Sequence, residues 1–360
     1  MLKKLLLNNE KNLFHVALSA LFFIGVTFAI TTCSRSVNYN PEKKHHGKNS
    51  FKTTIDVGSF DWYFMMFKEG SYPAIEQKDI DSVLAKVDLS YINSPSEMPR
   101  ATWIGHATVL VQHQGVNFLT DPHLTDYPSP FDWGSKRFTQ PALTFEEMPK
   151  IDILVISHNH YDHLDHRTVD FFGNSVIWFV PLGLKTWFLE RGIAAEKVIE
   201  LDWLDSHQFA ENVKITFAPN VHWSKRTPWD TNKSLWGSWA VQIDDFNSLF
   251  AGDTGYDKKL FKNIGEKLGP FQLAMIPIGA YVPRYFMSSQ HLDPAQAVLV
   301  HQDLRAQKSV PIHWATFQLS HEPFLEPPEL LAETMKKFGL PKENFRGLKI
   351  GETIEISFNQ

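Results

Sequence analysis

The chain has 360 residues and a mass of 41.4 kDa, of which 43% are hydrophobic and 21% are charged. This composition excludes a disordered chain and predicts a globular protein with a sizeable core. Proteins that bind nucleic acids usually have an excess of basic residues, whereas this chain has a formal net charge of −5, so we expect no nucleic-acid partner.

The N-terminal stretch has the pattern of an export signal. Lysines precede an apolar run at residues 13–32, in which His15 is the one ionisable side chain, and Cys33 follows. A basic start, an apolar stretch and small residues before a Cys are typical of exported proteins. We interpret residues 1–33 as a lipoprotein signal or as an uncleaved membrane anchor, since about 20 apolar residues can span a bilayer. In both cases we expect an exported protein that is held at a membrane, on the periplasmic face of a bacterial membrane.

A polar segment at residues 34–52 follows and predicts a tether, which leaves residues 53–360 as a single catalytic domain. We interpret His45 and His46 as solvated residues of this tether and not as metal ligands. Because Cys33 is the only Cys, no intrachain disulfide can form, and any metal site must use His and carboxylate side chains.

Hydrophobic patterning becomes strand-like from about residue 101. Residues 108–111 and 117–120 flank a Gln-Gly turn and predict a hairpin, and residues 151–157 predict a buried strand. Further strands are expected at residues 176–180, 214–218, 239–243, 248–251, 273–276 and 309–312, and helices at residues 182–191, 258–268, 294–304 and 328–338. Strands that alternate with helices in this way indicate a layered α/β sandwich.

The strongest chemical signal follows the strand at residues 151–157. Four potential ligands lie within six residues on the loop that leaves this strand, namely His158, His160, Asp162 and His163. The spacing lets the first two face one metal ion while the last two turn toward a second. Imidazole and carboxylate suit Zn²⁺, with Fe or Mn as other occupants.

A two-metal site needs three more ligands, including a carboxylate that can bridge. His222, Asp253 and His313 each follow an apolar run, and an open α/β sheet places its site at the carboxyl ends of its strands. The glycines at 252 and 255 permit close backbone approach around Asp253. Each residue alone has an ordinary structural interpretation, but their order after the first motif favours one shared site.

The ligand set resembles the signature of the metallo-β-lactamase superfamily, which is His-x-His-x-Asp-His followed by His, Asp and His on later strands. The likeness narrows to N-acyl-phosphatidylethanolamine-hydrolysing phospholipase D, in the same order from about residue 95 to residue 330. Besides the first ligand loop, the segments that resemble this family are TWIGHAT at 102–108, LTDP at 119–122, VHWSKR at 221–226, GAYVPR at 279–284, QHLDP at 290–294 and PIHW at 311–314.

This resemblance implies an αββα sandwich that holds two Zn²⁺ per chain. One zinc would be held by His158, His160 and His222, the other by Asp162, His163 and His313, and Asp253 would bridge them. The resemblance also implies substrate contacts by Tyr161 and His291. The sequence departs from the family pattern at residues 320–323, where SHEP replaces an Asn-Glu-His run, so His321 has no assigned role. The export signal has no counterpart in the animal enzymes of the family.

The resemblance therefore implies a zinc-dependent phosphodiesterase of the phospholipase D type. It would hydrolyse N-acyl-phosphatidylethanolamine, a phospholipid at a membrane surface, to N-acylethanolamine and phosphatidic acid. Asp253 or Asp162 would orient the attacking hydroxide, and His291 would protonate the leaving alkoxide unless it is a packed His. The alternatives are a lactonase or small-phosphoester hydrolase of the same superfamily, since one metal set serves several reactions, and a surface protein with a relic site. Because all seven ligands are present, the interpretation as a surface protein with a relic site is disfavoured. The sequence indicates no oligomeric state.

Several nearby residues have structural interpretations. We expect His106 and Asp121 to orient ligands from beneath the site. The tryptophans at 223, 229, 236 and 239 are interpreted mostly as core, although the loop from residue 222 to 236 would also suit the border of a lipid groove. Lys225 and Arg226 are interpreted as a solvated basic pair, with phosphate contact as the alternative.

Overall fold

The computed structural model describes residues 39–54, 72–95 and 98–357. The predicted export signal at residues 1–33 lies outside these residues. Within the described ranges, no helix combines the length and apolar character that crossing a bilayer requires.

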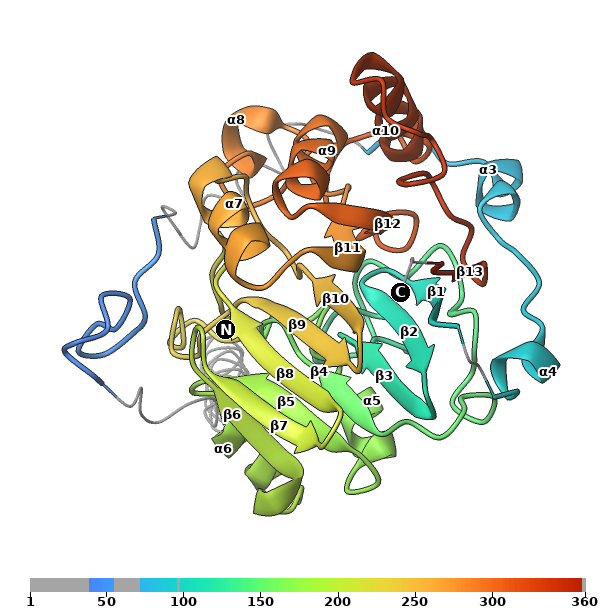
Figure 1. The fold of residues 1–360 in the computed structure, drawn as a ribbon. Coiled ribbons are helices and arrows are strands. Elements are labelled where there is room, and N and C mark those ends of the chain that lie inside the picture. The colour runs from blue at the N-terminus through green and yellow to red at the C-terminus, as the bar shows by residue number, and fades with distance from the viewer. Residues whose placement is uncertain (1–38, 55–71, 96–97, 358–360) are drawn as a thin grey trace, which may run out of the picture.

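Two β-sheets face each other, with helices on their outer sides (Figure 1). The strands of the first sheet are β1 (Arg100–Gly105), β2 (Thr108–His113), β3 (Val116–Thr120), β4 (Ile153–Val155), β5 (Ile177–Pro181), β6 (Val198–Leu201) and β13 (Thr353–Glu355). The strands of the second are β7 (Ser206–Ala210), β8 (Val213–Ala218), β9 (Ser238–Ile243), β10 (Phe246–Phe250), β11 (Phe271–Pro277) and β12 (Ala306–Ile312). Their orders are β13-β1-β2-β3-β4-β5-β6 and β12-β11-β10-β9-β8-β7.

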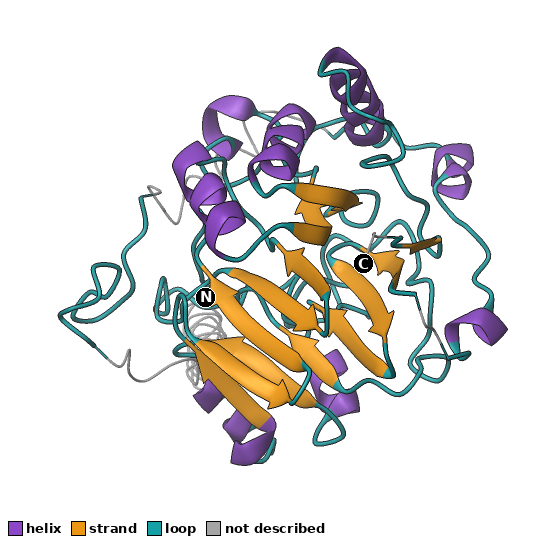
Figure 2. Cartoon of the chain, viewed as in Figure 1, coloured by secondary structure: helices purple, strands orange, loops and turns teal. Residues whose placement is uncertain are grey.

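The helices of the described residues are α3 (Gln77–Ser82), α4 (Leu89–Ile92), α5 (His166–Phe172), α6 (Lys185–Glu190), α7 (Lys258–Lys267), α8 (Arg284–Met287), α9 (Pro294–Asp303) and α10 (Glu326–Lys337), with a 3₁₀ turn at Ala195–Lys197. Helices α7 and α9 pack on the second sheet and α10 packs on α9, whereas α5 and α6 pack on the first sheet (Figure 2). The architecture is the αββα sandwich that the sequence predicted.

Successive side chains along a strand point to opposite faces of the sheet, so the buried strands contribute to two hydrophobic clusters. Phe118 and Val155 point between the sheets and pack in one cluster with Trp239. Their chain neighbours Leu119 and Leu154 point the other way, into the cluster beneath α5 and α6. Burying each large apolar side chain contributes about 1.5–3 kcal/mol, so these clusters fix the strand positions from which the site loops emerge.

The strands and helices predicted between residues 108 and 338 are confirmed, with ends shifted by a few residues. The strand predicted over residues 151–157 is shorter, because the Ser157 amide donates to the Asp121 side chain at 2.6 Å instead of continuing the sheet. Strand β7 was not predicted: its side chains are exposed or half-buried, so it has no apolar run.

The described part of the predicted tether packs on the catalytic domain. His46 is 3% exposed and Phe51 is 2% exposed. The Nε2 atoms of His45 and His46 lie 2.7 and 2.9 Å from the carboxylate of Asp202. The interpretation of the two histidines as solvated residues is therefore wrong. The Asn40 amide donates to His46 Nδ1 at 3.1 Å, so His46 carries its proton on Nε2, and the cluster is hydrogen-bonded and not ready for a metal ion.

Candidate metal centre

The predicted ligands lie on loops that leave the carboxyl ends of strands. The loop at residues 156–165 follows β4, and His222, Asp253 and His313 follow β8, β10 and β12. Strands β3 and β4 are parallel, as are β10, β11 and β12, and β8 has the same direction because β9 is antiparallel to both β8 and β10. The loops therefore meet at one edge of the sandwich.

Local backbone geometry lets these loops approach one another. A Cβ on Gly252, whose φ is 61°, would lie 2.6 Å from the Cβ of Ser157, so only glycine fits beside the first ligand loop. His313 and Asp121 have φ values of 65° and 29°. Such left-handed conformations cost about 1–3 kcal/mol for residues with a side chain and cluster at functional sites.

A first group of ligand atoms consists of three imidazoles. Nδ1 of His160 lies 2.9 Å from Nε2 of His158 and 3.4 Å from Nε2 of His222. Nδ1–H of His158 donates to the Ser157 hydroxyl at 2.9 Å, and Nδ1–H of His222 donates to the Gln290 carbonyl at 3.1 Å. These partners leave the Nε2 lone pairs of both rings pointing into one small space, which is the arrangement that a metal ion requires.

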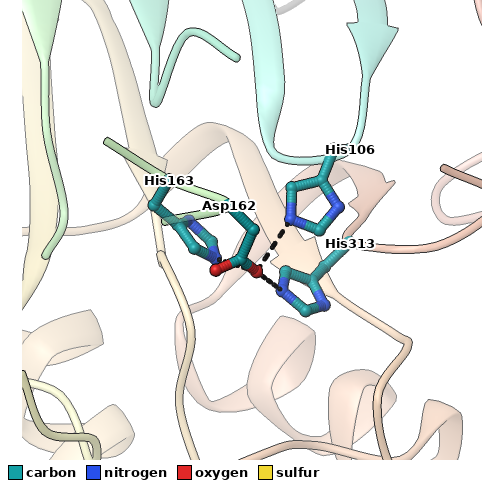
Figure 3. A group of neighbouring side chains, drawn as sticks. All are labelled: His106, Asp162, His163 and His313. Atoms are coloured by element: carbon teal, nitrogen blue, oxygen red, sulfur yellow. Dashed lines mark hydrogen bonds and ion pairs between the residues drawn. The ribbon is translucent and has the colours of Figure 1, made fainter. Parts of the chain in front are cut away.

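A second group surrounds the carboxylate of Asp162, on which three imidazoles converge (Figure 3). Asp162 Oδ2 lies 3.3 Å from Nε2 of His163, 3.3 Å from Nε2 of His313 and 3.2 Å from Nε2 of His106. His106 thus contacts a predicted ligand directly, and its Nε2 lies as close to Asp162 as those of the predicted ligands His163 and His313 do.

Asp253 connects the two groups through one oxygen. Its Oδ2 lies 3.1 Å from Nε2 of His163 and 3.1 Å from Nε2 of His313, and 3.9 Å from Nε2 of His222 in the first group. A carboxylate that bridges two ions must reach both ligand sets in this way.

Asp121 lies behind the second group and is fully buried. It accepts Nδ1–H of His163 at 2.6 Å, the Ser157 amide at 2.6 Å and the Ser157 hydroxyl. A carboxylate that accepts from the far nitrogen of an imidazole fixes its tautomer and its orientation toward a metal ion.

The electrostatics of the two groups differ. Burial lowers the pKa of His160 to about 4 and the pKa of His222 to about 3, so these imidazoles are neutral and able to coordinate. Burial opposes the charge on His313 as well, yet Asp253 and Asp162 raise its pKa to about 9. The buried carboxylate of Asp253 and the partly buried carboxylate of Asp162 thus place two negative charges beside the imidazoles, and the combined donor set suits metal cations.

The structure brings His291 to the same edge. Its ring centroid lies 5.4 Å from that of His222 and 5.6 Å from that of His313, and its Nδ1 lies 3.8 Å from Asp253 Oδ2. Nδ1 is buried and has no hydrogen-bond partner among the described residues, which suits a ligand contact. By contrast, His321 donates its amide to Val282 and its ring stacks on Tyr72.

The loop at residues 222–236 departs from the sequence interpretation. Trp236 and Trp239 are buried, as predicted, but Trp229 is 59% exposed, so its interpretation as core is wrong. Arg226 donates to backbone carbonyls of the first ligand loop at 2.7–3.5 Å and is therefore no solvated residue. Two features of the sequence indicated that it lies near the site, namely its position four residues after His222 and its place in the VHWSKR segment that resembles the family.

Comparison with known proteins shows which family the chain belongs to. Residues 116–314 match the family described as "Beta-lactamase superfamily domain". The chain is 43% identical over 295 residues to N-acyl-phosphatidylethanolamine-hydrolyzing phospholipase D 1 of Caenorhabditis elegans, a match that covers 78% of this chain and 83% of that protein. It is 38% identical over 259 residues to the mitochondrial N-acyl-phosphatidylethanolamine-hydrolyzing phospholipase D of Saccharomyces cerevisiae, covering 70% of this chain and 55% of that protein.

Among solved structures, the metallo hydrolase Igni18 of Ignicoccus hospitalis superposes with a TM-score of 0.55 at 22% identity. The superposition covers 73% of this chain and 100% of that structure. At this identity the likeness shows the fold alone.

Proposed function

The chain belongs to the metallo-β-lactamase superfamily and, within it, to the N-acyl-phosphatidylethanolamine-hydrolysing phospholipase D family, and from this premise we propose that it cleaves the phosphodiester of N-acylated phosphatidylethanolamine. It is a metal-dependent hydrolase. The products would be N-acylethanolamine and phosphatidic acid. The observation that carries the proposal is the reach of Asp253 Oδ2 to both ligand groups, in a chain 43% identical to a phospholipase D of this class.

In the proposed site, His158, His160 and His222 would hold one zinc ion, Asp162, His163 and His313 would hold the other, and Asp253 would serve both ligand groups. When bound, such a pair of ions would lower the pKa of a water molecule toward about 7 and relieve the negative charge on the phosphoryl oxygens. The donor set of imidazole and carboxylate matches this ion.

The protein's own groups position the reactants. Asp162 and Asp253 accept hydrogen bonds from the attacking water and hold it in line with phosphorus. His291 faces the space beside Asp253 and donates a hydrogen bond to the substrate at its leaving oxygen. Burial lowers the pKa of His291 to about 3, so its imidazole is neutral in the free protein and would polarise the leaving oxygen by a hydrogen bond. The proton that the attacking water gives up would pass to this oxygen, so that N-acylethanolamine leaves as the alcohol and phosphatidic acid keeps the new P–O bond.

A membrane surface is the proposed working place. The apolar run at residues 13–32 has the pattern of an export signal or anchor, and we propose that the protein is exported and held at a membrane by this segment. On the loop between β3 and β4, Phe131 and Trp133 stack at 5.9 Å, and Trp133 is 68% exposed. Exposed aromatic side chains favour the interface between water and lipid, which suits a phospholipid substrate.

The test is turnover of a defined N-acyl-phosphatidylethanolamine in detergent micelles by the full-length chain, with both products identified by mass spectrometry. We expect hydrolysis that a chelator abolishes and zinc restores, and about two metal ions per chain by elemental analysis. Turnover of a lactone or a soluble phosphodiester without lipid hydrolysis would instead identify the alternative hydrolase of the same superfamily. A metal content well below two would indicate a relic site.

A further inference from the structure

We propose that Arg226 and Tyr161 form a clamp that holds the first ligand group together and thereby determines how tightly its metal ion is retained. Both are positioning residues, and the inference rests on the proposed metal-dependent function. It gives Tyr161 a role in metal retention in place of the substrate contact that the family resemblance implies.

The first ligand group needs such a connection because its members come from different sheets. His158 and His160 lie on the loop after β4 in the first sheet, whereas His222 lies on the loop after β8 in the second. No sheet hydrogen bonds join β4 to β8. The spacing of about 3 Å between their nitrogen atoms therefore depends on contacts between the two loops.

Arg226 makes those contacts from the second loop. Its Nη1 donates to the carbonyl of Leu164 at 2.7 Å and to that of Asn159 at 3.0 Å, with a longer contact of 3.5 Å to the carbonyl of His160. These acceptors stand on both sides of residues 161–163. One guanidinium group thus fixes both ends of the turn that directs the ligands inward.

Tyr161, on the first loop, contacts the backbone of the second loop in turn. Its hydroxyl donates to the Arg226 carbonyl at 2.9 Å, and its ring lies 4.0 Å from the Arg226 guanidinium carbon. Each residue therefore holds the backbone of the other loop with its side chain. Tyr161 stands between two ligands, His160 and Asp162, so a change in its position is transmitted to both metal groups.

The base of the clamp is rigid. The buried carboxylate of Asp230 accepts the Arg226 amide at 3.0 and 3.2 Å and the Thr227 amide at 2.8 Å. The guanidinium group of Arg226 also lies over the ring of Trp187 in α6, with its Cζ atom 5.4 Å from the ring centroid. Lysine cannot replace this arginine, because a single ammonium group cannot reach separated carbonyls while it lies flat on an aromatic ring.

The experiment uses the full-length chain with Tyr161→Phe, Arg226→Lys and Arg191→Ala. The last is a matched control, because Arg191 lies 4.9 Å from the same Trp187 ring and pairs with Asp170 of α5. Zinc affinity is measured by competition with a chromophoric chelator, with zinc alone and no substrate. The kcat and KM values are then measured on N-acyl-phosphatidylethanolamine micelles.

We expect Tyr161→Phe and Arg226→Lys to weaken the binding of one of two zinc ions by about 10-fold or more, as changes in the partners of metal ligands do. At limiting zinc their kcat falls while KM stays close to the wild-type value, and excess zinc restores kcat. Arg191→Ala should leave zinc affinity, kcat and KM unchanged.

Wild-type zinc affinity in Tyr161→Phe together with a raised KM would overturn the clamp and assign the hydroxyl to substrate binding. Should Arg226→Lys fail to fold, Tyr161→Phe decides the matter, since it removes one oxygen atom only. If the wild-type chain binds zinc but hydrolyses no lipid, the proposed function fails, whereas the zinc titrations still test the clamp.

Discussion

Replacing Asp121 by Asn tests whether a buried carboxylate makes His163 available for metal binding. The carboxylate accepts Nδ1–H of His163 and the amide of Ser157, both at 2.6 Å. Asparagine has nearly the same size but only one acceptor oxygen. If this oxygen faces the Ser157 amide, the NH₂ group of Asn meets Nδ1–H of His163, and two donors then oppose each other. The imidazole must turn away or move its proton to Nε2, and either response removes the lone pair that a metal ion needs.

The expected loss of zinc affinity follows from that geometry. Changing an outer partner of a metal ligand weakens metal binding by about 10- to 100-fold, which corresponds to about 1.4–2.8 kcal/mol. A buried donor without an acceptor also costs about 1–3 kcal/mol of folding free energy. We therefore expect Asp121→Asn to lower the melting temperature of the metal-free protein by several degrees and to reduce the further stabilisation that zinc provides.

The assay is a zinc competition titration combined with thermal unfolding, with and without zinc. Asp165→Asn is the control, because Asp165 is a buried carboxylate that caps α5 by accepting the amides of Arg167 and Thr168. It should lose stability and keep zinc affinity. Asp121→Ala removes the acceptor without adding a donor, so it should bind zinc more tightly than Asp121→Asn. Wild-type zinc affinity in Asp121→Asn would refute the tautomer argument.

Three further outcomes are expected. Asp253→Asn should lower turnover to background and reduce the zinc content measured by elemental analysis, because amide coordination is weaker and Oδ2 is the atom that reaches both ligand groups; full activity would contradict a bridging role. Dialysis against a chelator should lower the melting temperature, and zinc at 100 times the Kd of a site should return about 2.7 kcal/mol of stability for each site that it fills, as measured by calorimetry. Asp202→Asn should cost about 2 kcal/mol at pH 7, because the His45 and His46 donors lose a charged acceptor. Burial raises the pKa of Asp202, but its hydrogen bonds outweigh burial, so the pKa in the folded protein lies below the ordinary value of about 4. The stability that Asp202 contributes is therefore present above about pH 4 and is lost as pH falls below it. Denaturant unfolding of the wild type and the variant at pH 7 and pH 3 would measure this difference.

The parts of the site that sequence could predict are those set by local pattern. His222, Asp253 and His313 were predicted because each follows an apolar run, and apolar runs mark strands whose carboxyl ends meet at one edge. Apolar runs on both sides of a turn gave the hairpin of β2 and β3, and the alternation of strands with helices gave the layered α/β class, whereas the order of the strands in each sheet came only from the structure. Metal chemistry helps, because it uses few residue types at short, fixed spacings.

The parts that sequence could not predict depend on partners far away along the chain. His46 and Asp202 are 156 residues apart, and nothing near His46 indicates that a buried carboxylate will meet it. The polar residues at positions 43–50 are as typical of a solvated tether as of a segment that packs on a domain. Burial here follows from a single long-range hydrogen-bonded cluster and the neighbouring Phe51, which composition cannot reveal.

Arg226 was misjudged for a related reason, and the reason is general to metal loops. A loop that turns its side chains inward to bind ions lacks the regular hydrogen bonds of a helix or a sheet, so its carbonyl groups must find other donors. The carbonyls of Asn159 and Leu164 find them on Arg226. Composition alone makes that arginine a typical solvated residue. The unmet acceptors of the neighbouring loop make it part of the site, and an arginine shortly after a late ligand is therefore worth testing as a clamp before it is assigned to the solvent.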